Sequence, residues 1–106
     1  MNEAEFQNAA TAALIRIEQA VEDCGVDIDF ENAGEILELE FANRSKIIIN
    51  KQSAVRQIWV AAKSGGFHYR FDPDSQQWRN DQSDAELFAE LSRLLSEQAG
   101  TDIQLE

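Results

Sequence analysis

The spacing of apolar side chains changes twice along this chain, and these changes restrict the folds that it can form. Between Phe6 and Cys24 the apolar residues recur every three or four positions, as on one face of a helix. From Val26 they alternate with polar residues, as in strands, and beyond Ser83 the helical spacing returns. Short connections between strands favour an antiparallel meander, and two amphipathic helices suffice to cover one of its faces.

The sequence therefore predicts an α+β sandwich, in which an antiparallel sheet of about five to six strands carries both helices on one face. At this length and apolar content, residues 1–106 are expected to form a single domain. The first helix is predicted over residues 3–23, and Ser83-x-x-Glu86 resembles a capping box that starts the last one. One hydrophobic core is expected from Phe6, Ile17, Val21, Ile47, Ile49, Ile58, Val60, Leu87, Leu91 and Leu94.

The charges of the chain are distributed unevenly. The formal net charge is -11, and residues 1–43 hold eleven acids with Arg16 as their only base. Phosphate backbones and anionic lipid surfaces are bound by clustered Lys and Arg, so neither nucleic acid nor a membrane surface is expected as a partner. An acidic half suits cations or a basic protein surface. The alternative is a solvated acidic face that only aids solubility.

Six carboxylates follow one another where the first helix ends and the first strand begins. The first three lie in the last turns of the helix, where the helix dipole favours bases instead. The other three occupy every second position of a strand that should begin near Val26, about 7 Å apart. Such a row of hard oxygen ligands suits divalent or trivalent cations, with little discrimination between them, at weak, partly hydrated sites. We call this set the acidic row: Glu18, Glu22, Asp23, Asp27, Asp29 and Glu31.

The uncovered face of the sheet should carry a tryptophan. Alternation places Trp59 on this face, together with Gln57 and Asn50. An exposed Trp between amide side chains is frequent in protein-binding hot spots, although Trp59 could equally stiffen the sheet by cross-strand packing. The single histidine, His68, has no second His or Cys at a zinc-ligand spacing, so an exposed polar residue on a strand is expected.

Several other classes of protein are disfavoured. The sequence contains no GxSxG motif, no Walker loop and no organised catalytic pattern, so the protein is not expected to be an enzyme. Its single cysteine, Cys24, continues the apolar stripe of the first helix and should be a small, buried hydrophobe. No apolar run reaches the roughly 20 residues of a membrane span, and the acidic N-terminus is unlike a signal peptide. A cytoplasmic protein is expected.

The segment NRSKIIINKQSAVRQIWVAAKSGGFHYRF, residues 43–71, resembles the signature of the frataxin family, in particular of its bacterial members. The resemblance extends over essentially the whole chain. It implies the frataxin α/β sandwich, iron binding, and a role in iron–sulfur cluster assembly beside the cysteine desulfurase and its scaffold protein. The acidic row and the outward Asn50, Gln57 and Trp59 match family positions. Gln19 replaces a frequent acid and the Gly25-Val26 connection is short, so the row is thinner here.

Three functions compete at this point. The first is a non-enzymatic, iron-binding regulator or adaptor of cluster assembly, as a monomer that metal could drive to oligomerise. The second is a protein that oxidises or stores iron, but the Glu-x-x-His pairs of four-helix di-iron sites are absent from the sequence. The third is an acidic protein-interaction module for which metal is incidental.

Overall fold

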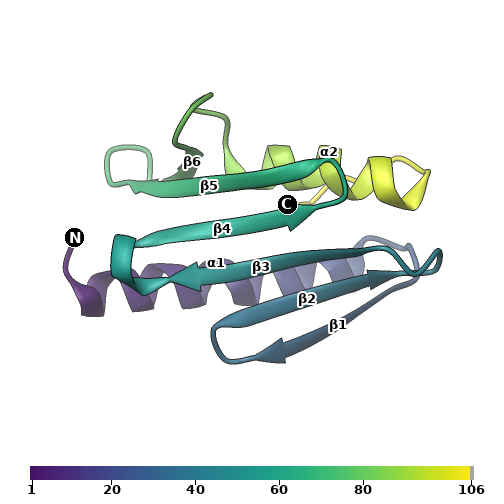
Figure 1. The fold of residues 1–106 in the computed structure, drawn as a ribbon, viewed down its shortest axis with the longest axis horizontal. Helices are drawn as coiled ribbons and strands as arrows, with labels where there is room; N and C mark the ends of the chain where they lie inside the picture. Colours follow the sequence, from purple (N-terminus) through teal and green to yellow (C-terminus); the bar gives the residue numbers. More distant parts are fainter. Residues whose placement is uncertain (106) are drawn as a thin grey trace.

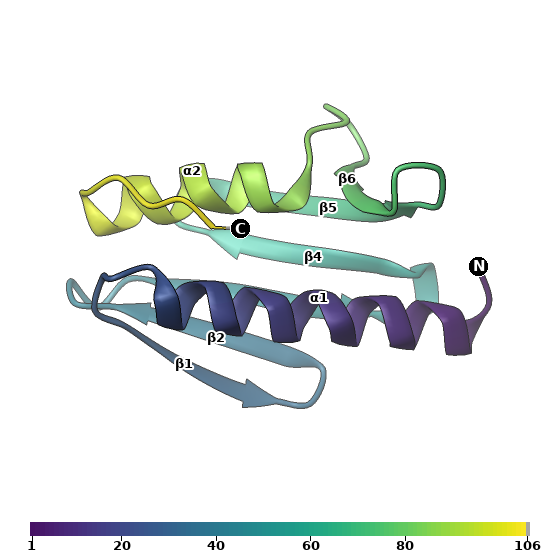
Figure 2. The ribbon, with the colours of Figure 1, turned by 180° about the vertical axis from the view of Figure 1, so that it is seen from behind.

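The computed structural model describes residues 1–105 and contains two helices and a six-stranded antiparallel sheet. The strands lie side by side in the order in which they follow one another in the chain. Both helices lie on the same face of the sheet, which leaves the other face uncovered (Figures 1 and 2). The predicted α+β sandwich is thus confirmed. The elements are α1 (Glu3–Asp23), β1 (Ile28–Ala33), β2 (Ile36–Phe41), β3 (Lys46–Gln52), the 3-10 turn η1 (Ser53–Val55), β4 (Gln57–Ala62), β5 (Gly65–Asp72), β6 (Gln77–Asn80) and α2 (Leu87–Ala99).

The hydrophobic core lies between the helices and the covered face of the sheet. All ten core residues expected from the sequence are buried. The segment after α2 adds Ile103 and Leu105 to this core, and their N–H groups donate to Ser96 Oγ (2.8 Å) and Ser92 Oγ (2.9 Å). Figure 2 shows this segment, in yellow, running back along α2 on the side that faces α1. The C-terminal segment thereby helps to close the core between the two helices.

The start of α2 differs from the sequence prediction. The N-cap is Glu86, whose carboxylate accepts the N–H groups of Phe88 and Ala89 at 2.8 and 3.1 Å. The prediction of a capping box at Ser83 is wrong. Asn80 Oδ1 accepts the Gln82 and Ser83 N–H groups and holds this segment in a turn, so no helix begins there. The helix therefore begins one turn later than the motif indicated.

The first strand is shorter and less buried than its alternating sequence predicted. It begins at Ile28, because the chain bends through Cys24, Gly25 and Val26 after α1. Phe30, which alternates with Asp29 and Glu31, retains 38% of its surface exposed. The reason is its position in an edge strand, which has a neighbouring strand on one side only. Cys24 is half-buried against the core, so its assignment as an apolar packing residue holds only in part.

Candidate functional site

The helical part of the acidic row lies on the last two turns of α1. Glu18, Glu22 and Asp23 are all exposed, and the last turn of the helix contains no base. Glu18 Oε1 accepts a 2.6 Å hydrogen bond from Asn32 Nδ2, which links α1 to the edge strand β1. None of these three carboxylates forms an ion pair within residues 1–105. Their charge is therefore uncompensated at short range.

The strand part of the acidic row lies on the uncovered face of the sheet, opposite further acids. In the β1–β2 register Asp29 is paired with Glu40, and Glu31 with Glu38. Directly opposite side chains share one face and lie about 5 Å apart, closer than neighbours along a strand. Asp27 precedes β1 and lines a shallow hollow of about 290 Å³ together with Asp29 and Glu40.

Glu38 and Glu40 were missed as members of this site by the sequence analysis. Both alternate with the core residues of β2, so their outward direction was evident, but their opposite partners were not. A signal was present: the β1–β2 hairpin turns at Gly34, whose φ is 74°, a value that glycine adopts without strain. Counting outward from this turn brings Glu31 and Asp29 opposite Glu38 and Glu40.

Two bases lie at this acidic cluster: Arg44, which lines the hollow with Asp27, Asp29 and Glu40, and Lys46. Lys46 Nζ is 3.1 Å from Glu38 Oε1 and lies opposite Glu40 in the β2–β3 pair. The hydrogen bond to Glu38 and the charges of the surrounding carboxylates raise the pKa of Lys46 above its ordinary value. Lys46 therefore stays charged at neutral pH and offsets part of the repulsion between the carboxylates.

The cluster can be compared with what a metal ion requires. Within residues 1–105, no group of three or more His, Cys, Asp or Glu side chains is arranged to enclose an ion. The opposite pairs Asp29–Glu40 and Glu31–Glu38 can each offer two carboxylates from neighbouring strands. Two oxygen donors on an exposed surface leave most coordination positions to water. The geometry thus fits a weak, hydrated cation site better than a closed metal centre.

Trp59 lies on the same uncovered face, in the middle of the sheet. It is half-buried, opposite Asn50 on β3, and its Nε1–H donates to Gln57 Oε1 at 2.8 Å. The His68 imidazole stacks on the indole, with ring centroids 4.2 Å apart and an angle of 11° between the planes. His68 was expected to be an exposed polar residue on a strand; it lies on β5 with 44% of its side chain exposed, but the stack on Trp59, which follows from the antiparallel β4–β5 register, was missed.

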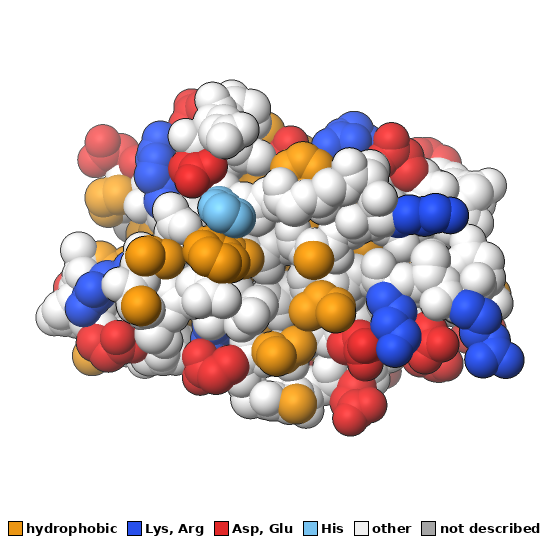
Figure 3. Space-filling model, in the orientation of Figure 1, with side chains coloured by type: hydrophobic (Ala, Val, Ile, Leu, Met, Phe, Trp, Pro, Cys, Tyr) orange, Lys and Arg blue, Asp and Glu red, His pale blue; other side chains and the backbone are white. Residues whose placement is uncertain are grey.

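Figure 3 shows how the uncovered face is divided. Acidic and basic side chains gather toward one end of β1 and β2, while hydrophobic side chains gather beside the histidine, in pale blue. Asp29 and Glu31 therefore share a face with Trp59, whereas Glu18, Glu22 and Asp23 belong to the helical layer behind it. The acidic row is thus divided between the two layers, and its members Asp29 and Glu31 share the surface of Trp59.

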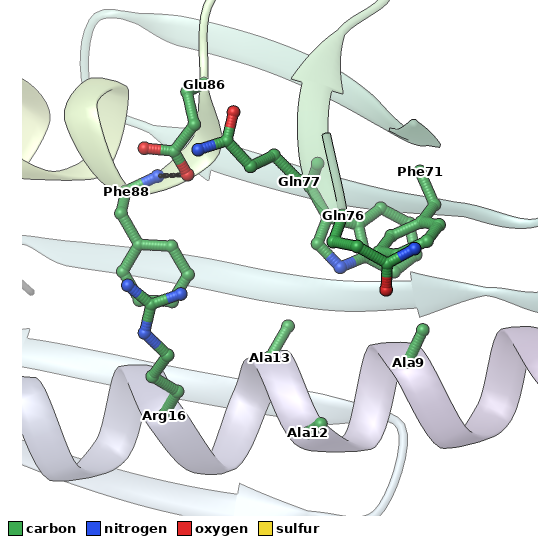
Figure 4. Close-up of a pocket in the computed structure, with 10 residues that line it drawn as sticks. Ala9, Ala12, Ala13, Arg16, Phe71, Gln76, Gln77, Glu86 and Phe88 are labelled. Carbon is green, nitrogen blue, oxygen red and sulfur yellow. Dashed lines mark hydrogen bonds between the residues drawn. The ribbon is translucent and has the colours of Figure 1, made fainter. Parts of the chain in front are cut away.

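A groove of about 300 Å³ lies in the helical layer, between α1 and the start of α2 (Figure 4). Alanines of α1 form one side, and the Arg16 guanidinium lies 4.0 Å from the centre of the Phe88 ring. Glu86 also lines the groove, but its carboxylate caps α2. The charged groups of this groove are thus engaged with the fold, and we place the candidate site on the uncovered face of the sheet and the adjoining end of α1.

Comparison with known proteins identifies the family. A model of the frataxin-like domain matches residues 1–101. The chain belongs to the frataxin family. A solved structure described as frataxin from Psychromonas ingrahamii superposes with a TM-score of 0.91 at 33% sequence identity, covering 100% of this chain and 99% of that one. The expected family and its sandwich fold are therefore confirmed.

Several similar sequences of the frataxin family carry a functional name. The protein from Dechloromonas aromatica is 52% identical over 99% of both chains, and that from Paraburkholderia xenovorans is 46% identical over 100% of this chain and 99% of its own. The Pseudomonas aeruginosa protein is 45% identical over 98% of this chain and 96% of its own. All three are named iron-sulfur cluster assembly protein CyaY. Within residues 1–105, neither helix is long and apolar enough to cross a membrane.

Proposed function

We propose that this chain is a non-enzymatic, iron-binding protein that regulates iron–sulfur cluster assembly or supplies iron to it. The observation that carries the proposal is the similarity, over nearly the full length, to proteins named for that assembly. The cysteine desulfurase and the iron–sulfur scaffold protein are the proposed partners. Residues 1–106 would act as one domain in the cytoplasm, as a monomer that metal can drive to associate.

Iron is the proposed cargo of the acidic row. Glu18, Glu22, Asp23, Asp27, Asp29 and Glu31 would bind it, and the structure adds Glu38 and Glu40 as neighbours of the last two. Carboxylate oxygens accept Fe²⁺ and Fe³⁺ but also other divalent and trivalent cations. The exposure of these groups supports weak binding with rapid exchange, which suits transfer to a partner more than storage.

Trp59, Gln57 and Asn50 are the proposed contact residues for a protein partner. Trp59 offers a large ring on a face that no other element covers. The neighbouring carboxylates would steer a basic partner surface toward this ring, because exposed charges act mainly on the rate of encounter. Trp59→Ala should therefore act on dissociation and cost about 2 kcal/mol of binding free energy, as is typical for a central aromatic anchor.

Anaerobic titration calorimetry with Fe²⁺, with and without the desulfurase, tests the proposal. The wild-type chain should bind Fe²⁺ weakly, and the Asp29→Asn/Glu31→Gln variant should bind it more weakly still. Trp59→Ala should bind Fe²⁺ like the wild type but dissociate faster from the desulfurase or the scaffold. Wild-type binding of both partners by Trp59→Ala would contradict the proposed contact residues. A chain that binds neither iron nor either partner would contradict the function.

One observation favours a second candidate, an acidic interaction module for which metal is incidental. It is the lack of any enclosing group of three ligands within residues 1–105. Titration calorimetry distinguishes the two candidate functions. The module should bind the desulfurase with the same affinity in the presence and absence of Fe²⁺, and should give no Fe²⁺ heat that the row variants reduce.

A further inference from the structure

The stack of His68 on Trp59 is the feature of the uncovered face that the proposed function leaves without a role. The two residues face one another on neighbouring strands, and their rings lie 4.2 Å apart and nearly parallel. The His68 side chain keeps 44% of its surface exposed, so burial in the core does not enforce this arrangement. Stacked ring pairs attract one another by more than the free energy of the apolar surface that they bury. The His68–Trp59 pair can therefore stay together on an open surface.

The indole is held in two independent ways. Gln57 accepts the indole N–H at 2.8 Å and so restrains one edge of the ring, and the imidazole covers one of its two flat faces. On the side of β3, Asn50 is the residue opposite Trp59. An indole on an open sheet without these contacts would exchange between staggered rotamers.

His68 is itself supported from the far side. The Asp81 N–H donates to the His68 carbonyl oxygen at 2.9 Å, and Asp81 Oδ2 lies 3.9 Å from His68 Nδ1. The result is a row across the sheet from Asp81 through His68 to Trp59. The backbone hydrogen bond fixes the chain at His68 and the ring stack orders the two side chains, which is the arrangement expected of a surface that is ordered before a partner arrives.

We propose that His68 is a positioning residue for Trp59, which holds the indole in the one orientation that a protein partner binds. This rests on the proposed function of Trp59 as an anchor. If only a fraction of the molecules present the indole correctly, the apparent affinity falls by that fraction. Immobilising one side chain typically changes affinity about 2- to 10-fold. Loss of the stack should appear as slower association, because bound molecules still make the same Trp59 contacts.

The test compares two variants of similar size. His68→Gln keeps a polar side chain but removes the ring, and His68→Phe keeps a ring that can stack but removes both nitrogens. The ¹⁵N order parameter of the Trp59 indole N–H in the free protein reports whether the ring is held. Association and dissociation rates on immobilised desulfurase and scaffold protein report the consequence. Thermal unfolding confirms that each variant is folded, as expected for a half-exposed position.

His68→Gln should lower the order parameter and slow association about 2- to 10-fold with little change in dissociation. His68→Phe should restore both values toward the wild type. An unchanged order parameter in His68→Gln would overturn the proposal, because Gln57 alone would then hold the ring. Faster dissociation with unchanged association would also overturn it, since His68 would then contact the partner itself.

The same experiment separates this proposal from the one on which it rests. If Trp59→Ala weakens binding and His68→Gln does not, the anchor stands and the positioning role falls. If Trp59→Ala binds both partners like the wild type, Trp59 is no anchor, and the positioning role falls with it.

Discussion

Neutralising the strand part of the acidic row should stabilise the fold. In Asp29→Asn/Glu31→Gln, two carboxylates that lie opposite Glu40 and Glu38 lose their charge while their size is kept. Neither Asp29 nor Glu31 forms an ion pair within residues 1–105, so no close ion pair is broken. The substitutions therefore remove the repulsion from Glu40 and Glu38, together with a more distant attraction to Lys46 and to Arg44.

The size of the gain follows from the register. Two unit charges about 5 Å apart in water repel by about 0.8 kcal/mol, and screening at 0.1 M salt reduces this to about 0.5 kcal/mol. Two such pairs give about 1 kcal/mol of added stability when their charges are removed. The smaller repulsion between Asp29 and Glu31 adds to this gain, and the small loss of attraction to Lys46 offsets that addition. For a domain of this size that corresponds to a rise of about 4–8 °C in Tm. At 1 M salt the gain should fall to about 0.3 kcal/mol.

Urea denaturation followed by circular dichroism, at 0.1 and 1 M NaCl, measures this gain. Asp102→Asn is the matched control, because it removes one charge from an exposed position with no acid opposite it. A double-mutant cycle between Asp29→Asn and Glu40→Gln isolates one opposite pair, and its coupling should be repulsive. A loss of stability, or a gain that does not depend on salt, would refute the reasoning and assign these carboxylates a structural role.

Three further outcomes are expected for the helical layer. Glu86→Ala should lower the free energy of unfolding, measured in urea melts, by about 1 kcal/mol through loss of the helix cap. Ser83→Ala should lower it by about a few tenths of a kcal/mol at most, and equal losses would contradict the observed cap. The Tyr69 hydroxyl donates a hydrogen bond to the nearly buried Glu90 carboxylate, and burial, with this bond as the second cause, raises the Tyr69 pKa. The stabilisation that the neutral Tyr69 hydroxyl provides should therefore be complete below about pH 10 and be lost above it. Tyr69→Phe should abolish that alkaline step in a pH series of melts. The Gln98→Ala variant should lose about 1–3 kcal/mol of stability, because it leaves the Lys46 carbonyl of β3 and the Lys63 N–H in the turn after β4 without their side-chain partner; unchanged melts would show that water replaces it.

Much of the fold could be predicted from the sequence because it depends on local spacing. Residues such as Ile47 and Ile58 alternate with polar neighbours, and burying them requires only that the strand present one face to the helices. The same alternation placed Trp59 on the uncovered face without any knowledge of its neighbours. The capping box failed through competition between local signals, because the turn closed by Asn80 displaced the cap expected at Ser83.

The candidate site, like the fold, could be predicted only in part from the sequence. Alternation by itself determined that Asp29, Glu31 and Trp59 point away from the core, and the order of periodicities determined the sandwich. The turn at Gly34 already indicates that Glu40 lies opposite Asp29, but only the tertiary structure decided that the His68 ring stacks on Trp59. These pairs join residues of different strands, and a register shift of one position would send each side chain to the other face. Register depends on the turns and on the packing of the sheet against both helices, and the ring stack depends on side-chain conformations that the local spacing of residues does not encode.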